Sequence, residues 1–430
     1  MRHLPSARGV SLIELMIATT ITAVALTGAI TVVRSQQKAF YDGQRLRSAQ
    51  TNGRRALLAI EEALPRAGFG MDASLALDVA PWYAPSAAPL CPAGMGTCPR
   101  DATANSDELV FYARDPRYWI PASNQASPVG HAWTISAVTA TTVSINARLG
   151  DVFRNGQIFL AVCPNSSTYA YFTAGETVRV DADGSRDVTL AGVVPENPFR
   201  RQDVAAATAC FSTTAPADPA RLFLVDRYRF HVRPEPVGRV GTAVQYDPLL
   251  VLDQGIDSDG DGDVDEMDEQ LVAEGVESIQ VSYQLYTGLE AGATPGTAVT
   301  FTPGTAATAT ATANTLTTTS FPGAAPAAGE TAYAPTSFYG YAYGPPPATE
   351  RNTNHQANVE AIRVAVLARS ATSDLQAMAF PTTGAFNQNA FPAWVTDFVT
   401  ANGGRDGYQR IEFETAVTLP NMSTRAMTYF

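Results

Sequence analysis

The feature that most constrains the fold is a run of apolar and small residues, 10–33, preceded by a short start that contains Arg2 and Arg8. The only charged residue in the run is Glu14. A run of this length is long enough to cross the hydrocarbon core of a bilayer as a helix. A lone carboxylate in such a run is costly in lipid and indicates a function. We therefore expect a helix that lies in lipid or among similar helices, with Glu14 as a candidate functional residue.

The apolar run is compatible with three kinds of N-terminus. The first is a plain membrane anchor, whose basic start stays in the cytoplasm. The second is a secretory signal peptide, with Ala23-Val24-Ala25 as a small-x-small cleavage site. The third is a precursor protein whose short leader peptide is cleaved immediately before the apolar run; a family resemblance supports this possibility.

The helical pattern continues beyond the apolar run. Apolar or small residues recur at spacings of three and four, which is one helical stripe: Leu46, Ala49, Gly53, Leu57, Ile60 and Leu64. Pro65 ends the pattern. We expect one helix from about residue 10 to 64, roughly 80 Å long at 1.5 Å per residue. Its first half, 10–33, is apolar all round, and its second half, 34–64, is amphipathic and packs on the protein's own ectodomain.

The remainder, 65–430, is predicted to be a β-rich ectodomain, so the fold class is α+β. Runs with strand character are separated by turn residues, the clearest being 107–113, 221–232, 277–285, 359–368 and 411–419. One short helix is expected within 389–401. The segment 291–329 is dominated by Thr, Ala, Gly and Pro and is predicted to be an irregular, low-complexity insertion. The net charge of −12 argues against a nucleic-acid partner, which favours a basic surface.

A second strong motif occupies residues 257–268. It has the spacing of a twelve-residue EF-hand-type loop, with glycine at position six and an acid at position twelve. The predicted calcium ligands are Asp257, Asp259, Asp261, Asp263 (through its carbonyl), Asp265 (directly or through water) and Asp268. Glu266 or Glu269 are alternatives at the last position because Asp is shorter than the usual Glu. Strand-like sequence follows from Val276, so we expect an isolated structural calcium loop between β elements, and a solvated acidic turn is the alternative.

Four cysteines lie beyond the apolar run: Cys91, Cys98, Cys163 and Cys210. An even number in an oxidising compartment suggests two disulfides. The pairs Cys91–Cys98 and Cys163–Cys210 are the most economical of the three possible connectivities. Metal ligation by these cysteines is disfavoured because they lack Cys-x-x-Cys spacing.

The sequence contains no recognisable catalytic motif. Its four histidines, His3, His131, His231 and His355, have no metal-ligand spacing. Nucleophile-elbow, His-Glu-x-x-His and phosphate-loop patterns are also missing from the sequence. We therefore expect a protein that is not an enzyme.

The start of the chain resembles the type IV pilin signature: a short basic leader ending in Gly9, an apolar residue, Val10, and Glu14 at the fifth position after it. The resemblance implies a leader peptide, 1–9, cleaved by prepilin peptidase between Gly9 and Val10, and N-methylation of Val10. It also implies that Glu14 acts in assembly. The usual residue at the position of Val10 is Phe, and Val departs from it.

Five later stretches are similar, in the same order, to PilW-type minor pilins, and they begin at Ala49, Ser106, Leu271, Ala361 and Phe413. This resemblance implies a minor pilin that helps to start assembly of the pilus fibre at its tip, with other major and minor pilins as partners. It further implies an inner-membrane stage with the ectodomain in the periplasm, followed by a place in the fibre at the cell surface. The alternatives are a J-like pseudopilin of type II secretion, a tip adhesin subunit and an anchored periplasmic enzyme.

Overall fold

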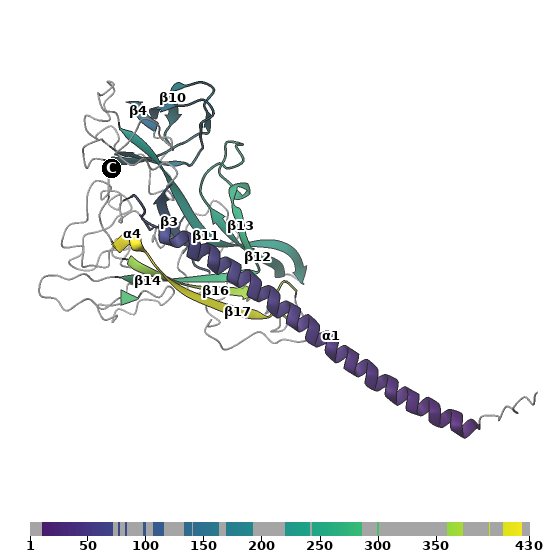
Figure 1. Cartoon of the computed structure of the whole chain (residues 1–430). Coiled ribbons are helices and arrows are strands. Elements are labelled where there is room, and N and C mark those ends of the chain that lie inside the picture. The colour runs from purple at the N-terminus through teal and green to yellow at the C-terminus, as the bar shows by residue number, and fades with distance from the viewer. Residues whose placement is uncertain are drawn as a thin grey trace, which may run out of the picture.

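A computed structural model gives the fold of the chain (Figure 1). It describes residues 11–71, 76–77, 82–83, 98–99, 106–115, 133–139, 141–162, 169–191, 220–240, 243–285, 299–300, 359–372, 395 and 407–423. The architecture is one long helix that docks with its second half on a β-rich ectodomain and projects from it with its first half (Figure 1).

Helix α1 extends from Leu12 to Ala63 and continues as a 3-10 turn, η1 (Leu64–Arg66). The prediction of one helix over about 10–64 is therefore confirmed for the described residues. Pro65 falls inside the 3-10 turn, which accounts for the end of the α-helix at this point.

Nine of the described strands form one antiparallel sheet. Its main path is β10 (Gly184–Thr189), β5 (Thr142–Ala147), β4 (Trp133–Val138), β11 (Arg221–Val240), β12 (Ala243–Asp253) and β13 (Gln270–Glu274). Strands β3 (Leu109–Arg114) and β7 (Ile158–Val162) also pair with β11, and β8 (Tyr169–Thr173) pairs with β7. Strand β11 is thus the central element that joins the upper and lower parts of the ectodomain in Figure 1.

A second sheet has the order β15 (Val299–Thr300), β14 (Val276–Leu285), β16 (Val359–Arg369) and β17 (Arg410–Thr418). Two short pairs complete the described strands: β1 (Trp82–Tyr83) with β2 (Cys98–Pro99), and β6 (Val152–Phe153) with β9 (Val178–Arg179). A short helix, α4 (Pro420–Ser423), follows β17.

The docked half of α1 packs against β16 and β17. Four residues of the predicted stripe are buried: Ala49, Gly53, Ile60 and Leu64. Leu57 is partly buried, whereas Leu46 is 43% exposed, and Ala56, which lies next to the stripe, is fully buried. At Gly53 the helix approaches β17 so closely that an added Cβ would lie 2.3 Å from Cε2 of Phe413. This close contact requires a residue without a side chain.

The structure extends the strand predictions in one important place. The run predicted at 221–232 continues to Val240, because β12 pairs with it in a long hairpin. Pro234 and Pro236 interrupt the sequence signal, and the register shifts between Pro236 and Gly238, as at a β-bulge. The predicted helix within 389–401 lies outside the described residues except for Val395, which is helical.

Candidate functional site: the N-terminal helix and the acidic loop

Glu14 lies in the first turn of α1. The backbone N–H of Ser11, the N-cap residue, donates to Glu14 Oε2 at 3.4 Å, and the two residues form a capping box. A carboxylate here also interacts favourably with the positive end of the helix dipole. Glu14 is exposed in the folded chain.

The helix that follows Glu14 is exposed along its whole apolar length. Every residue from Leu12 to Val33 is exposed, Leu12 by 77%. The hydroxyls of five threonines donate to backbone carbonyls of the preceding turn at 2.7–3.0 Å: Thr19, Thr20, Thr22, Thr27 and Thr31. These polar groups are satisfied within the helix, which suits it to lipid or to a bundle of similar helices. By length and composition α1 can cross a membrane.

The acidic loop brings three of its predicted ligands together. Carboxylate oxygens of Asp257, Asp259 and Asp261 lie within 4.8 Å of one another. Asp257 is fully buried, whereas the other two are exposed. The N–H groups of Gly260 and Gly262 donate to Asp257 Oδ1 and Oδ2 at 2.5 and 3.2 Å. Both glycines have positive φ, +85° and +104°, which lets the chain fold back over Asp257.

The remaining acids of the loop are placed differently. Asp268 Oδ1 accepts from the N–H of Ser258 at 2.5 Å, and its Oδ2 accepts from the N–H of Asp265 at 3.0 Å. Burial raises the pKa of Asp268, but these hydrogen bonds outweigh it and lower the pKa below its ordinary value. Asp265 accepts from the N–H of Met267 at 2.7 Å, and Asp263 is exposed. Asp268 therefore closes the loop in this structure.

Residues in the segment between β6 and β9 donate hydrogen bonds to the acidic loop. Arg154 Nη1 donates to the carbonyls of Asp257 and of the residue after it, at 2.7 and 2.6 Å. Asn155 Nδ2 donates to the carbonyl of Gly262 at 2.8 Å. The hydroxyl of Thr177 donates to Asp257 Oδ2, and this bond is the largest cause of the lowered pKa of Asp257. The loop thus joins the β12–β13 connection to the part of the ectodomain that contains β6 and β9.

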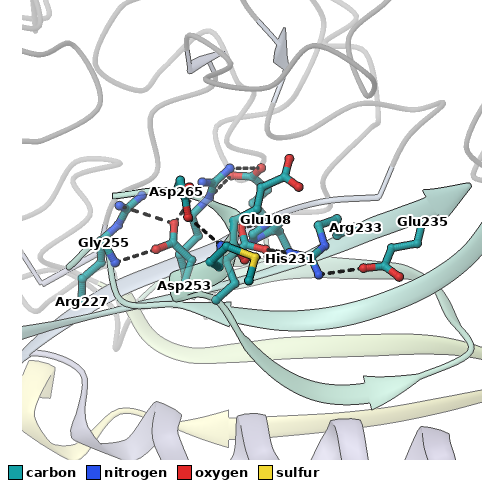
Figure 2. Close-up of polar contacts among 12 residues, drawn as sticks. Glu108, Arg227, His231, Arg233, Glu235, Asp253, Gly255 and Asp265 are labelled. Atoms are coloured by element: carbon teal, nitrogen blue, oxygen red, sulfur yellow. Dashed lines mark hydrogen bonds and ion pairs between the residues drawn. The ribbon is translucent and has the colours of Figure 1, made fainter. Parts of the chain in front are cut away.

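Next to the acidic loop, β11 and its neighbouring strands carry a network of largely buried ion pairs (Figure 2). Arg229 Nη2 contacts Glu108 Oε1 at 2.9 Å, and its Nη1 contacts Asp253 Oδ2 at 3.1 Å. Arg227 Nη1 lies 3.6 Å from Asp253 Oδ2. Burial raises the pKa of Asp253, but the positive charges of Arg227 and Arg229, together with the N–H of Gly255, outweigh it and bring the pKa to about 2.

The network continues at the other end of the loop. Glu269 accepts from Arg233 Nη1 at 2.6 Å and lies 3.2 Å from His231 Nε2. Asp253 and Glu269 therefore attach the two ends of the acidic loop to β11. This network was not predicted from the sequence, although a signal existed: basic residues occupy every second position from Arg227 to Arg233, on the opposite face of the strand from its apolar residues.

Several residues singled out in the sequence lie outside the described part of the chain: His3, Gly9, Val10, Cys91, His131, Cys163, Cys210 and His355. Cys98 lies in β2, and the two disulfides stay a prediction. The insertion 291–329 also lies outside it, apart from β15. His231 is buried in the ion network, in accord with a packing role.

Comparison with known proteins identifies the class of the N-terminus. Residues 4–30 match the prokaryotic N-terminal methylation motif. The search of curated proteins and the search of solved structures return no match. The motif, together with a long apolar helix followed by a β-rich ectodomain, supports a type IV pilin-like prepilin. It implies processing by prepilin peptidase and assembly with other pilins in a pilus or pseudopilus.

Proposed function

We propose that the protein is a non-catalytic, PilW-type minor pilin that helps to start a type IV pilus at its tip. The observation that carries this proposal is the fully exposed apolar half of α1, with Glu14 at its start, attached to a large ectodomain. The apolar half has to be covered by lipid or by neighbouring helices. The size of the ectodomain favours a rare subunit at the end of a fibre over the repeating shaft subunit.

The proposed life of the subunit has two stages. In the first, α1 spans the inner membrane with the ectodomain in the periplasm, and prepilin peptidase cuts between Gly9 and Val10 on the cytoplasmic side. Val10 is then N-methylated. In the second stage α1 leaves the membrane and packs into the helical core of the fibre, where burial among other apolar helices replaces lipid.

Glu14 is proposed to face the Val10 amine of a neighbouring subunit in that core. Each charge is costly alone in an apolar bundle, and pairing them offsets much of the cost. Because the pair forms at one axial offset, it also sets the register between subunits. In the isolated chain Glu14 bonds only weakly to Ser11, at 3.4 Å, which leaves it available for this exchange.

The test is the substitution Glu14→Ala, with Glu62→Ala as the matched control. Both residues are exposed acids on α1, but Glu62 lies on the ectodomain half. We expect E14A to accumulate in membranes as the wild type does and to be lost from sheared fibres, as judged by immunoblotting both fractions. E62A is expected in both fractions. Undiminished E14A in sheared fibres would refute the role of Glu14.

We further propose that the acidic loop binds Ca²⁺ as a structural ion. Three carboxylates converge at Asp257, Asp259 and Asp261, and calcium prefers six to eight oxygen ligands. Asp263, Asp265 and Asp268 are the proposed additional ligands, and Asp268 has to turn from the backbone N–H groups that it now accepts from.

The calcium proposal is tested by calorimetric titration and thermal unfolding of the purified full chain in detergent. At a hundredfold excess over Kd, calcium is expected to stabilise the fold by about 2.7 kcal/mol. The variant Asp259→Asn/Asp261→Asn should lose this effect, and Asp187→Asn, an exposed acid on β10, should keep it. A wild-type chain without saturable heat, and with the same melting temperature in chelator, contradicts the proposal.

A further inference from the structure

Between its apolar run and its docked half, α1 presents two cations and two aromatic side chains. Arg34 and Lys38 are exposed, as are Phe40 and Tyr41, by 62% and 58%. The two rings contact each other edge to face, with centroids 6.1 Å apart. All residues from 34 to 41 are exposed, and the helix in this region is clear of the ectodomain in Figure 1.

When α1 spans a membrane, the length of its apolar run fixes the depth of residues 34–41 relative to the lipid headgroups. Residues 12–33 span about 33 Å at 1.5 Å per residue, close to the roughly 30 Å of a hydrocarbon core. Arg34 to Tyr41 covers about 12 Å more, which is the layer of lipid headgroups and the water next to it. Docking on the ectodomain follows directly, since Arg45 Nε lies 3.4 Å from Thr372 Oγ1 and Ala49 is fully buried.

The cations are not explained by membrane insertion. Loops that stay in the cytoplasm carry the excess of Lys and Arg, and in the proposed orientation Arg2 and Arg8 supply it. Arg34 and Lys38 then lie on the opposite side, where this bias disfavours them. Attraction to anionic headgroups accounts for both cations, and the preference of amphipathic aromatic rings for the headgroup level accounts for Tyr41, against which Phe40 packs.

We propose that Arg34, Lys38, Phe40 and Tyr41 form a collar that binds anionic phospholipid headgroups on the ectodomain side of the membrane. The collar holds α1 at one depth before assembly. Arg34 and Lys38 are one turn apart on the same face of the helix, so they contact neighbouring headgroups together. The inference rests on the proposed function, since it requires α1 to span the membrane first.

The first test measures lipid selectivity. The full chain is placed in phosphatidylcholine vesicles with spin-labelled phosphatidylglycerol or phosphatidylcholine, and the immobilised fraction of each label is compared. Removing one cation, as in Arg34→Gln or Lys38→Gln, should lower the preference for phosphatidylglycerol by up to about fivefold. The double variant should lose the whole contribution of the collar and keep only the preference that Arg2 and Arg8 supply at the opposite face. The control Arg54→Gln/Arg55→Gln, exposed cations about 30 Å further along the helix, should keep it.

The second test measures depth. In Tyr41→Trp, fluorescence should be quenched more by lipids brominated near the headgroup than by lipids brominated near the chain end. The four native tryptophans are subtracted with the unsubstituted chain. The collar is refuted if the double variant keeps the lipid selectivity of the wild type, or if the control loses selectivity to the same extent. It is also refuted if headgroup-brominated lipids quench Tyr41→Trp no more than they quench the unsubstituted chain. A chain that alkaline carbonate releases from the vesicles overturns instead the membrane stage of the proposed function.

Discussion

Replacing Asp253 by Asn should destabilise the ectodomain in a way that depends on pH. The pKa of Asp253 is about 2 against an ordinary 3.8, because Arg227 and Arg229 outweigh the effect of burial. A folded pKa below the unfolded value means that the ionised carboxylate stabilises the fold above the unfolded pKa. This contribution is lost as the pH falls toward 2. At 1.36 kcal/mol per pKa unit it amounts to about 2 kcal/mol at pH 7 and to roughly half of that at pH 3.

The variant Asp253→Asn removes the carboxylate from Arg229, 3.1 Å away, and from the N–H of Gly255, 2.5 Å away. We expect the free energy of unfolding at pH 7 to fall by at least about 2 kcal/mol, because a buried cation loses one of its partners. The difference between wild type and variant should shrink by about 1 kcal/mol at pH 3, since the wild type loses its advantage there.

The assay is urea unfolding of the full chain in detergent at both pH values, followed by circular dichroism. A chelator is present throughout, so that cation binding to the acidic loop does not contribute. Glu235→Gln is the matched control, because Glu235 also pairs with an arginine of β11 but its side chain is 51% exposed. It should change stability little at either pH. A wild-type advantage over D253N that is equal at pH 7 and pH 3 would refute the electrostatic account.

Two further substitutions test how the ectodomain is held together. Gly53→Ala should lower the free energy of unfolding by about 1–3 kcal/mol, because its Cβ would overlap the ring of Phe413; Gly43→Ala, with no atom within 4 Å, should not lower it, and equal effects would contradict the close-contact argument. Glu277→Gln should cost about 3–5 kcal/mol in urea unfolding, because Glu277 is fully buried between two arginines. Glu414→Gln, from an exposed pair, should cost at most about 1 kcal/mol, and a similar small loss in E277Q would contradict the burial argument.

The strands with local signals were predictable. The runs expected at 107–113, 277–285, 359–368 and 411–419 appear as β3, β14, β16 and β17. The hairpin of β11 with β12 was not predictable in full, because Pro234, Pro236 and Pro248 weaken the strand signal on both sides. Its length comes from pairing across the hairpin, with Pro234 opposite Pro248, which no local propensity encodes.

What the sequence by itself determined is the part of the protein governed by local spacing. The apolar run to Val33, the stripe beyond it, Glu14 and the acidic loop follow from periods of a few residues, and they predict a pilin-like helix and a candidate calcium loop. Only the tertiary structure decided that Asp253 and Glu269 fasten this loop to β11, and that Arg154 and Thr177 hold it from the opposite side. These contacts join residues up to a hundred or so positions apart, so they depend on strand register and chain closure, which short sequence patterns do not specify.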